Sequence, residues 1–396
     1  MAWHGCSGAS RRVALRPRRA DPAGADTVMI ALEHLSKVYG VPGSVAAVDD
    51  VSMRVGTGEI CVLIGPSGCG KTTTMRMVNR LVTSTSGRVL INGRDSADID
   101  TVELRRGIGY VIQQVGLFPN MTVEENIGVV PRLLGWPQTR IRARAAELLD
   151  MVGLDVGQFL GRFPNQLSGG QQQRVGVARA LAADPPLLLM DEPFGAIDPI
   201  NRAAIQDQFL AMQHKLKKTV LLVSHDIDEA VKMADRIAIF RAGRLEQVGT
   251  PDEILTAPAN DFVAGFIGPD PTLKRLRRKR VAEVHVPLLV SVGQTVEVAT
   301  DGCTGSIQVG AMGQVVAVRV DGRAMGPVSV RMDCDLRVVV SELLRLGVHW
   351  LPSVDADGRL RGVVSLAAIS RQVGASHDMV PRQVPSTEGE RHEPAR

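Results

Sequence analysis

Short apolar runs alternate with amphipathic stretches from residue 30 to about residue 268. Four of these runs predict buried strands, at Ile60–Ile64, Leu187–Met190, Val220–Val223 and Ile237–Phe240. Between the first two of them, one face of a predicted helix over residues 140–151 carries Ile141, Ala145, Leu148 and Leu149. Strands and helices that alternate in this way are typical of an α/β fold with a largely parallel sheet, here with a helical insertion.

Local sequence marks the starts of three further helices. Thr122 and Thr250 are each followed three residues later by a glutamate, Glu125 and Glu253, which is the capping-box pattern. Pro251 stands at the first helical position of the second of these helices, where proline is favoured. A third helix is predicted over residues 72–82, shortly after the first strand.

The character of the chain changes after Gly268. A basic run, Lys274–Arg280, is followed by valine-rich segments that glycines interrupt. Within them, Asp335–Leu346 predicts a helix and Trp350–Ser365 predicts a strand, a turn and a strand. We expect a disordered basic arm at 1–28, the α/β domain at 29–268, a basic linker at 269–280, a small α+β domain at 281–373 and a disordered tail at 374–396.

Composition excludes several classes of protein. Of the 396 residues, 44% are hydrophobic and 22% are charged, as in ordinary globular proteins. No run approaches the roughly 18 consecutive apolar residues that a membrane-spanning helix needs. The formal net charge of +4 gives no argument for binding nucleic acid, and we expect none to be bound.

The start of the chain and its cysteines bear on location. The arginine-rich start lacks the apolar core of a secretory signal, and translation from Met29 stays an alternative to translation from Met1. The five cysteines show neither a Cys-x-x-Cys pair nor metal-type spacing. We therefore expect free thiols in a reducing cytoplasm.

The segment after the first strand has the chemistry of a phosphate-binding loop. Residues 65–72 fit the pattern G-x-x-x-x-G-K-[ST], and the predicted strand before it and helix after it are the context that the motif requires. Glycines let successive N–H groups turn toward phosphate oxygens, Lys71 adds a cation, and the Thr72 hydroxyl can bind Mg²⁺. The predicted contacts to a nucleotide come from Gly65, Pro66, Ser67, Gly68, Cys69, Gly70, Lys71, Thr72 and Thr73.

Two carboxylates follow the strand at residues 187–190. Asp191 is placed to hold Mg²⁺ through water, and Glu192 is placed to polarise an attacking water. An acidic pair after a strand is by itself more often a solvated turn. The two roles therefore depend on the neighbouring motifs.

A third motif, Leu167–Arg174, precedes that strand and reads Leu-Ser-Gly-Gly-Gln-Gln-Gln-Arg. Ser168 and the N–H groups of Gly169 and Gly170 open a helix and so point toward an anion. Here the chain resembles the ABC (ATP-binding cassette) ATPase family. The resemblance implies ATP and Mg²⁺ as cofactors, and it implies that this loop closes over the ATP of a second subunit. Because the chain holds one such set of motifs, we expect a homodimer.

The resemblance assigns roles to four more residues. Tyr39 would stack on adenine, with a packed surface tyrosine as the competing interpretation. Gln113, which has Gln114 beside it, matches the glutamine that senses Mg²⁺ and the attacking water, so we expect a catalytic and a metal-binding role. Asp198 matches the aspartate of the loop that contacts the partner subunit's site. His225 matches the catalytic switch histidine that contacts the γ-phosphate, although a lone histidine is more often structural.

The rest of the chain narrows the kind of ABC protein. The chain has no long coiled-coil insertion, no second ATPase module and no fused membrane spans, so we expect an importer subunit rather than a DNA-repair, translation or exporter protein. Two segments, Ile64–Leu81 (especially Thr72–Leu81) and Asp261–Gly268, resemble the ATP-binding subunits of importers for glycine betaine, carnitine, choline or proline. The similarity spans roughly residues 30–276. Importers of methionine, polar amino acids or polyamines stay the alternative within transport.

The same resemblance implies partners at a membrane. An integral membrane permease is expected, and through it a substrate-binding protein. The permease would dock on Gly116–Thr122, for which an ordinary buried loop is the competing interpretation. The chain would then lie at the cytoplasmic face of the cell membrane. We expect Lys274–Arg280 either to contact the anionic membrane surface or to be a solvated linker.

Osmoprotectant subunits of this kind commonly carry two C-terminal CBS (cystathionine β-synthase) motifs. The segment from Asp335 to Ser365 reads as one repeat, and Ala299–Val328 reads as a degenerate first repeat. A purely structural C-terminal domain is the alternative. The rival function from another class is a non-transport regulatory ATPase whose CBS-like domain binds a nucleotide or a protein.

Overall fold

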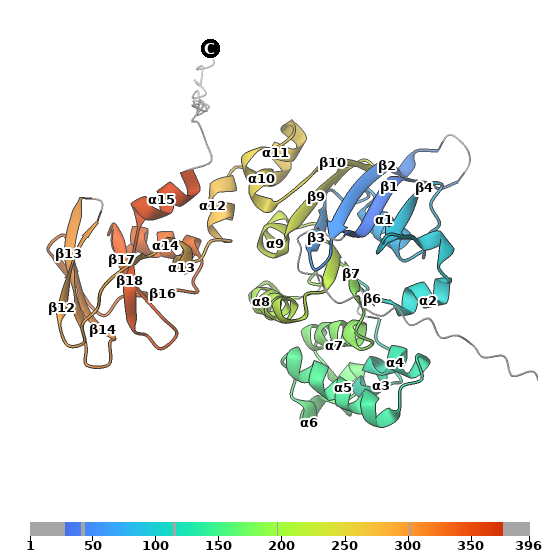
Figure 1. Cartoon of the computed structure of the whole chain (residues 1–396), viewed down its shortest axis with the longest axis horizontal. Coiled ribbons are helices and arrows are strands. Elements are labelled where there is room, and N and C mark those ends of the chain that lie inside the picture. The colour runs from blue at the N-terminus through green and yellow to red at the C-terminus, as the bar shows by residue number, and fades with distance from the viewer. Residues whose placement is uncertain (1–27, 41–43, 114–115, 196, 301, 375–396) are drawn as a thin grey trace, which may run out of the picture.

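The computed structural model describes residues 28–374 except 41–43, 114–115, 196 and 301. The predicted disordered arm and tail therefore lie almost entirely outside the described residues. A larger N-terminal part and a smaller C-terminal part are joined by a short helical segment (Figure 1). Among the described helices, none is both long and apolar enough to cross a membrane.

A six-stranded sheet forms the centre of the larger part. Its order is β10–β9–β3–β8–β7–β6, parallel except for β10 at one edge. The strands are β3 (Ile60–Ile64), β6 (Ile108–Val111), β7 (Leu187–Asp191), β8 (Thr219–Val223), β9 (Arg236–Arg241) and β10 (Arg244–Gly249). The four predicted strands are confirmed as β3, β7, β8 and β9, to within one residue at each end.

A second, antiparallel sheet lies beside the first and has the order β2–β1–β4–β5. Its strands are β1 (Val28–Val38), β2 (Ala46–Gly56), β4 (Ser86–Ile91) and β5 (Arg94–Asp95). Alternate residues of β3 face two apolar cores: Ile60, Val62 and Ile64 belong to one, and Cys61 and Leu63 belong to the other. The second of these cores also contains the inner residues of β1 and β2. The antiparallel sheet therefore packs on one face of the parallel sheet.

The helices of the larger part confirm most of the predicted starts. Capping boxes are present at Thr122 and Thr250. The helix predicted over 72–82 ends at Val78, because Arg80 takes a left-handed conformation (φ 49°). The helices are α1 (Lys71–Val78), η1 (Ser96–Asp98), α2 (Thr101–Arg106), α7 (Gly169–Leu181), α8 (Pro199–Leu216), α9 (Ile227–Met233), α10 (Pro251–Thr256) and α11 (Asp261–Ile267).

The predicted helical insertion lies between β6 and β7. It contains α3 (Val123–Ile127), α4 (Val129–Leu133), α5 (Gln138–Met151), α6 (Val156–Phe159) and η2 (Pro164–Gln166). The four apolar residues that predicted α5 are the four that the helix buries. Three of them, Ala145, Leu148 and Leu149, extend the first core away from the sheet.

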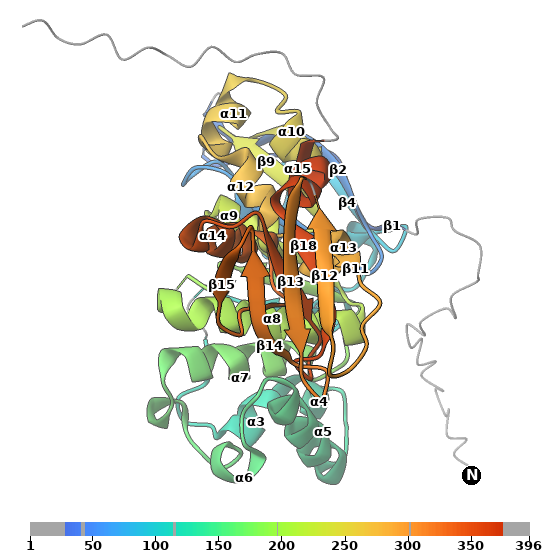
Figure 2. The ribbon, with the colours of Figure 1, turned by 90° about the vertical axis from the view of Figure 1, so that its left-hand side faces the viewer.

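The smaller part has its own core and two four-stranded sheets (Figures 1 and 2). An antiparallel meander contains β12 (Thr295–Thr300), β13 (Cys303–Val309), β14 (Val315–Val320) and β15 (Arg323–Met325). The other sheet, in the order β11–β18–β17–β16, contains β11 (Val286–Pro287), β16 (Val330–Arg331), β17 (Trp350–Val354) and β18 (Leu360–Ser365). Helices α14 (Leu336–Leu346) and α15 (Leu366–Gly374) accompany this second sheet. The sequence predicts α14 and the two strands that follow it, but not α15.

The segment predicted to be a basic linker is folded between the two parts. It contains α12 (Pro271–Leu276) and is followed by α13 (Val281–Val284). Helix α12 contacts α9 and α10 on one side and α14 and α15 on the other. Leu276 is 4% exposed and belongs to the core of the smaller part.

Three cations of this segment, Lys274, Arg277 and Arg278, contact α9. Lys274 Nζ lies 2.5 Å from Asp228 Oδ1, and Arg277 Nη1 lies 3.0 Å from Asp228 Oδ2. Arg278 donates to two main-chain carbonyls at the other end of α9, at 2.9 and 2.6 Å, where the negative end of a helix favours a cation. The sequence predicts that this run is solvated or contacts the membrane. In the structure, these three cations contact α9 instead. Sequence shows the charges but not their partner, Asp228, which lies 46 residues before Lys274.

We expect Asp228→Asn to loosen this junction. A partly exposed ion pair contributes up to about 1 kcal/mol, and a change of that size corresponds to about a fivefold change in an opening equilibrium. Trypsin should therefore cleave the native variant within Lys274–Arg280 about fivefold faster than the wild type. Asp270→Asn is the matched control, because it removes the same charge beside α12 from a side chain that does not cap the helix. Equal cleavage rates in the two variants would contradict the assigned contacts.

Candidate functional site

The predicted phosphate loop connects β3 to α1 at the carboxyl end of the parallel sheet. Gly65, Gly68 and Gly70 all have positive φ, at 146°, 78° and 99°. A Cβ on Gly70 would lie 2.3 Å from the carbonyl oxygen of Ala47, and one on Gly65 would lie 2.2 Å from that of Phe240. Both positions therefore require glycine, because the loop's main chain is pressed against β2 and β9.

Lys71 is 6% exposed and extends back along this loop. Its Nζ donates to the carbonyl oxygens of Gly65 at 2.8 Å and Pro66 at 3.0 Å, and it lies 3.6 Å from Cys69 Sγ. Pro66, Ser67 and Gly68, at the top of the loop, are exposed. The arrangement thus combines an open loop with a fixed cation, which suits a phosphate.

A pair of oxygen ligands lies at the start of α1. Thr72 Oγ1 donates to Asp191 Oδ1 at 2.9 Å, and Asp191, the last residue of β7, is 3% exposed. Burial raises the pKa of Asp191, and the hydrogen bond from Thr72 opposes that rise. A hydroxyl and a carboxylate are hard oxygen donors, so this pair fits Mg²⁺.

Glu192 is the residue on which the other predicted catalytic side chains meet. Gln113 Nε2 donates to Glu192 Oε2 at 3.0 Å, and His225 Nδ1 lies 3.4 Å from the same oxygen. Glu192 has φ 46°, a backbone conformation that residues other than glycine rarely adopt and that is concentrated at functional sites. Its main-chain N–H is held by the carbonyl of Val223 at 3.0 Å. Gln114, the alternative to Gln113, lies outside the described residues.

The sequence did not predict that Glu229, a glutamate near His225, is buried. Glu229, on α9, is 8% exposed and accepts a hydrogen bond from Ser224 Oγ at 2.9 Å. Burial raises the pKa of Glu229 to about 7. Asp226 caps α9, so Glu229 reads in the sequence as an ordinary acidic residue of a helix's exposed first turn. The available signal was its position beside His225, but only the fold shows that it is buried.

The motif at residues 168–170 is not joined to the phosphate loop of its own chain. Ser168 is exposed and caps α7, with a capping box formed by Gln171. Within the described residues, no hydrogen bond or ion pair connects Ser168, Gly169 or Gly170 to residues 65–72. The positive end of α7 is therefore open to a ligand from outside the chain.

Two further predicted residues are exposed. Tyr39 is 51% exposed, with the Nζ of Lys37 5.0 Å from the centre of its ring, so the ring is available for stacking but is not placed against the loop by any contact. Asp198 is exposed just before α8. Thr73, in the first turn of α1, is half-buried.

Known proteins resemble this chain over most of its length. Residues 48–195 match the family described as ABC transporter. The chain is 51% identical to the osmoprotectant import ATP-binding protein OsmV of Salmonella typhimurium, over 85% of this chain and 94% of that protein. It is 45% identical to the glycine betaine/carnitine/choline transport ATP-binding protein OpuCA of Bacillus subtilis, over 86% and 95%.

A solved structure extends the comparison to three dimensions. It is the dimeric, post-hydrolysis state of the ATP-binding cassette MJ0796 bound to ADP and Pi. The TM-score is 0.51 at 35% identity, and the match covers 56% of this chain and 98% of that one. The larger part of this chain therefore has the ABC ATPase cassette fold, as the sequence predicts.

Two alanine substitutions test the close packing of the loop. Both Gly68 and Gly70 have positive φ, which costs alanine on the order of 1 kcal/mol. Only at Gly70 would the new Cβ also meet main-chain atoms, whereas nothing lies within 4 Å of one at Gly68. We therefore expect Gly70→Ala to lower the thermal midpoint of the nucleotide-free protein clearly more than Gly68→Ala. Equal losses in calorimetry would show that the loop is not held against Ala47.

Proposed function

The chain belongs to the ATP-binding subunits of the ABC transporters that import osmoprotectants, and on that premise we propose how it couples ATP hydrolysis to the uptake of a compatible solute. Glycine betaine, carnitine, choline and proline are the proposed solutes. The observation that carries the proposal is the shared Glu192 oxygen, on which Gln113 and His225 converge beside the Thr72–Asp191 pair. The alternative importers, for methionine, polar amino acids or polyamines, would use the same site.

The residues divide the chemistry of hydrolysis among them. The N–H groups of the loop and Lys71 hold the β- and γ-phosphates of ATP. Thr72 and Asp191, with Gln113 nearby, would hold Mg²⁺, which supplies a positive charge to the phosphate oxygens. Glu192 accepts the proton of the attacking water as the water oxygen bonds to the γ-phosphorus and the bridging oxygen leaves with ADP. His225 contacts the γ-phosphate and, with Gln113, fixes the carboxylate of Glu192.

A second copy of the chain completes the site in this proposal. Ser168, Gly169 and Gly170 are exposed or half-exposed and lack contacts to their own phosphate loop, so we place them on the γ-phosphate of the partner's ATP. Asp198 lies at the same junction, and Tyr39 stacks on adenine. The cassette MJ0796 is dimeric in its solved structure, which supports the pairing of two copies.

The other partners are a permease and, through it, a substrate-binding protein. Residues 116–122 are the proposed docking loop, and within it Phe118 is 44% exposed. The main-chain carbonyl of Phe118 accepts a hydrogen bond from the fully buried Asn126, at 3.1 Å. This bond fixes the main chain that carries the exposed ring. This docking would hold the chain at the cytoplasmic face of the membrane.

The smaller part is proposed as a regulatory domain with one CBS-like repeat. Its elements follow the order β16, α14, β17, β18 and α15, and β16 pairs with β17 in parallel. The segment Ala299–Val328 contains strands and, among its described residues, no helix. The proposed domain boundaries stay near residues 268 and 281, with α12 between the two domains.

We expect Glu192→Gln to separate binding from hydrolysis. The amide keeps the size of the side chain and loses the base, so hydrolysis by the purified protein should fall by about 10²–10⁴ while ATP is still bound. The variant should also accumulate as an ATP-bound dimer in size-exclusion chromatography. Glu103→Gln, on the exposed face of α2, is the control and should hydrolyse ATP like the wild type.

Transport is tested with the same two variants. In a strain that lacks its own osmoprotectant importers, the wild-type chain and Glu103→Gln, expressed with the permease, should restore uptake of labelled glycine betaine. Glu192→Gln should not. Uptake of labelled spermidine or methionine in place of all four solutes would favour the alternative importers, and undiminished hydrolysis by Glu192→Gln would remove Glu192 from its role.

A further inference from the structure

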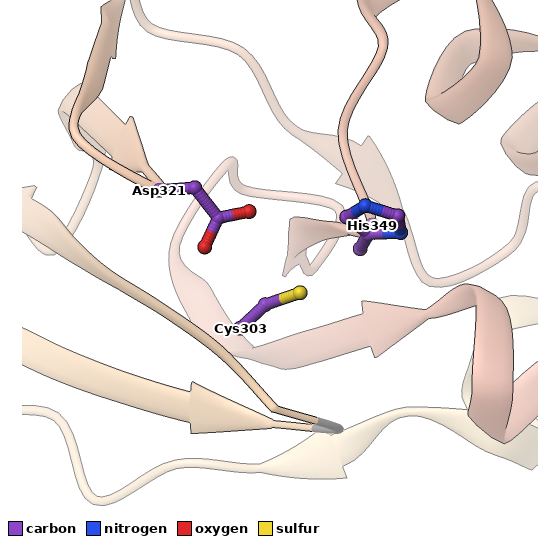
Figure 3. A group of neighbouring side chains, drawn as sticks. All are labelled: Cys303, Asp321 and His349. Atoms are coloured by element: carbon purple, nitrogen blue, oxygen red, sulfur yellow. The ribbon is translucent and has the colours of Figure 1, made fainter.

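Three side chains from separate segments of the smaller part gather at one point (Figure 3). The ligand atoms of Cys303, Asp321 and His349 all lie within 4.8 Å of one another. Cys303 is half-buried, and Asp321 and His349 are exposed. None of the three belongs to the proposed ATP site, and sequence spacing did not connect them.

The carboxylate of Asp321 is fixed by the meander. Asp321 and Gly322 form the turn between β14 and β15, with φ of 48° and 80°, as two-residue hairpin turns require. The main-chain N–H of Asp321 donates to the carbonyl of Thr304 at 2.8 Å, and the N–H of Thr304 donates to Asp321 Oδ1 at 3.1 Å. Because Thr304 follows Cys303, these two bonds bring the carboxylate beside the thiol. Within the described part of the chain, Asp321 Oδ2 accepts no hydrogen bond.

His349 reaches the same point from the other sheet. Gly347 ends α14 in a left-handed conformation (φ 65°), and the chain then enters β17 at Trp350. The indole ring of Trp350 packs so closely on β13 that a Cβ on Gly305 would lie 2.5 Å from it. This close approach, which glycine permits, holds the start of β17 against the start of β13. The ring of His349 makes no hydrogen bond or ion pair with any described residue.

The three ligand types together select a class of ion. Thiolate, imidazole and carboxylate are the ligands of Zn²⁺, with bonds of about 2.0–2.3 Å that place ligand atoms about 3.5 Å apart around a tetrahedron. The three ligand atoms lie within 4.8 Å of one another, and small changes in side-chain rotamers would bring them to this spacing. Mg²⁺ prefers oxygen ligands throughout and would be a poor occupant. Three protein ligands also leave a fourth position for water.

We propose that Cys303, Asp321 and His349 form a binding site for Zn²⁺ or a similar borderline transition-metal ion. On binding, the thiol of Cys303 releases its proton to solvent and its sulfur bonds to the ion. The bound ion joins the meander, through Cys303 and Asp321, to the sheet that contains β17, through His349. It therefore stabilises the smaller part by linking its two sheets.

The test uses the full chain, freed of metal and nucleotide, titrated with Zn²⁺ and separately with Co²⁺. The wild type should bind one more Zn²⁺ per chain than Cys303→Ser, and Zn²⁺ should raise the thermal midpoint of the wild type but not that of Cys303→Ser. The Co²⁺ protein should show a thiolate-to-metal charge-transfer absorption that Cys303→Ser lacks. Cys334→Ser is the matched control, since Cys334 is also half-buried in this part, and it should keep both signals. The thiol of Cys61 does not interfere, because burial raises its pKa to about 12.

Two further variants separate ligand loss from misfolding. Asp321→Asn keeps an oxygen for the N–H of Thr304, and His349→Gln changes an exposed side chain, so both should unfold like the wild type in EDTA. Each should weaken Zn²⁺ binding by at least about tenfold, since loss even of groups that only orient a metal's ligands costs about 10–100-fold. Equal Zn²⁺ stoichiometry in the wild type and Cys303→Ser, or an absorption that is lost in Cys334→Ser, would overturn the proposal.

Discussion

Parallel pairing of β3, β8 and β7 is the constraint on which the site depends. Leu63, Val223 and Asp191 are register partners in one row across these strands. The segments that follow them must therefore leave the sheet at the same edge, where ligands of open α/β sheets bind. This is why Thr72 and Asp191, which are 119 residues apart, share a hydrogen bond, and why Gln113 and His225 meet on Glu192.

The glycines of the phosphate loop allow the loop to pack closely at that edge of the sheet. Gly65 and Gly70 let the main chain lie against the carbonyls of Phe240 and Ala47, so the loop is held by both sheets at once. The ammonium of Lys71 is held by carbonyls of the same loop. The cation and the loop are thus fixed relative to the carboxylates before any nucleotide arrives, which is the condition for electrostatic stabilisation at low reorganisation cost.

Sequence predicted what is encoded locally. The phosphate loop, the strands buried on both faces and the capping boxes each lie within a few consecutive residues, so spacing alone identified them. The burial of Glu229, the attachment of Lys274 and Arg277 to Asp228, and the meeting of Cys303 with His349 depend on which surfaces the fold brings together. Charge and spacing carry no information on such distant partners. The basic run illustrates the limit, because its charges were evident while its partner helix, α9, was not.

In the proposed dimer, each ATP is enclosed by the phosphate loop of one copy and Ser168 of the other. Mixing two inactive variants tests it most directly, because Lys71→Ala damages one component and Ser168→Arg damages the other. In an isologous dimer each mixed pair keeps one intact composite site, so an equal mixture should regain about a quarter of wild-type hydrolysis. Hydrolysis no greater than the mean of the two separate variants, with mixed dimers demonstrably formed, would contradict the account.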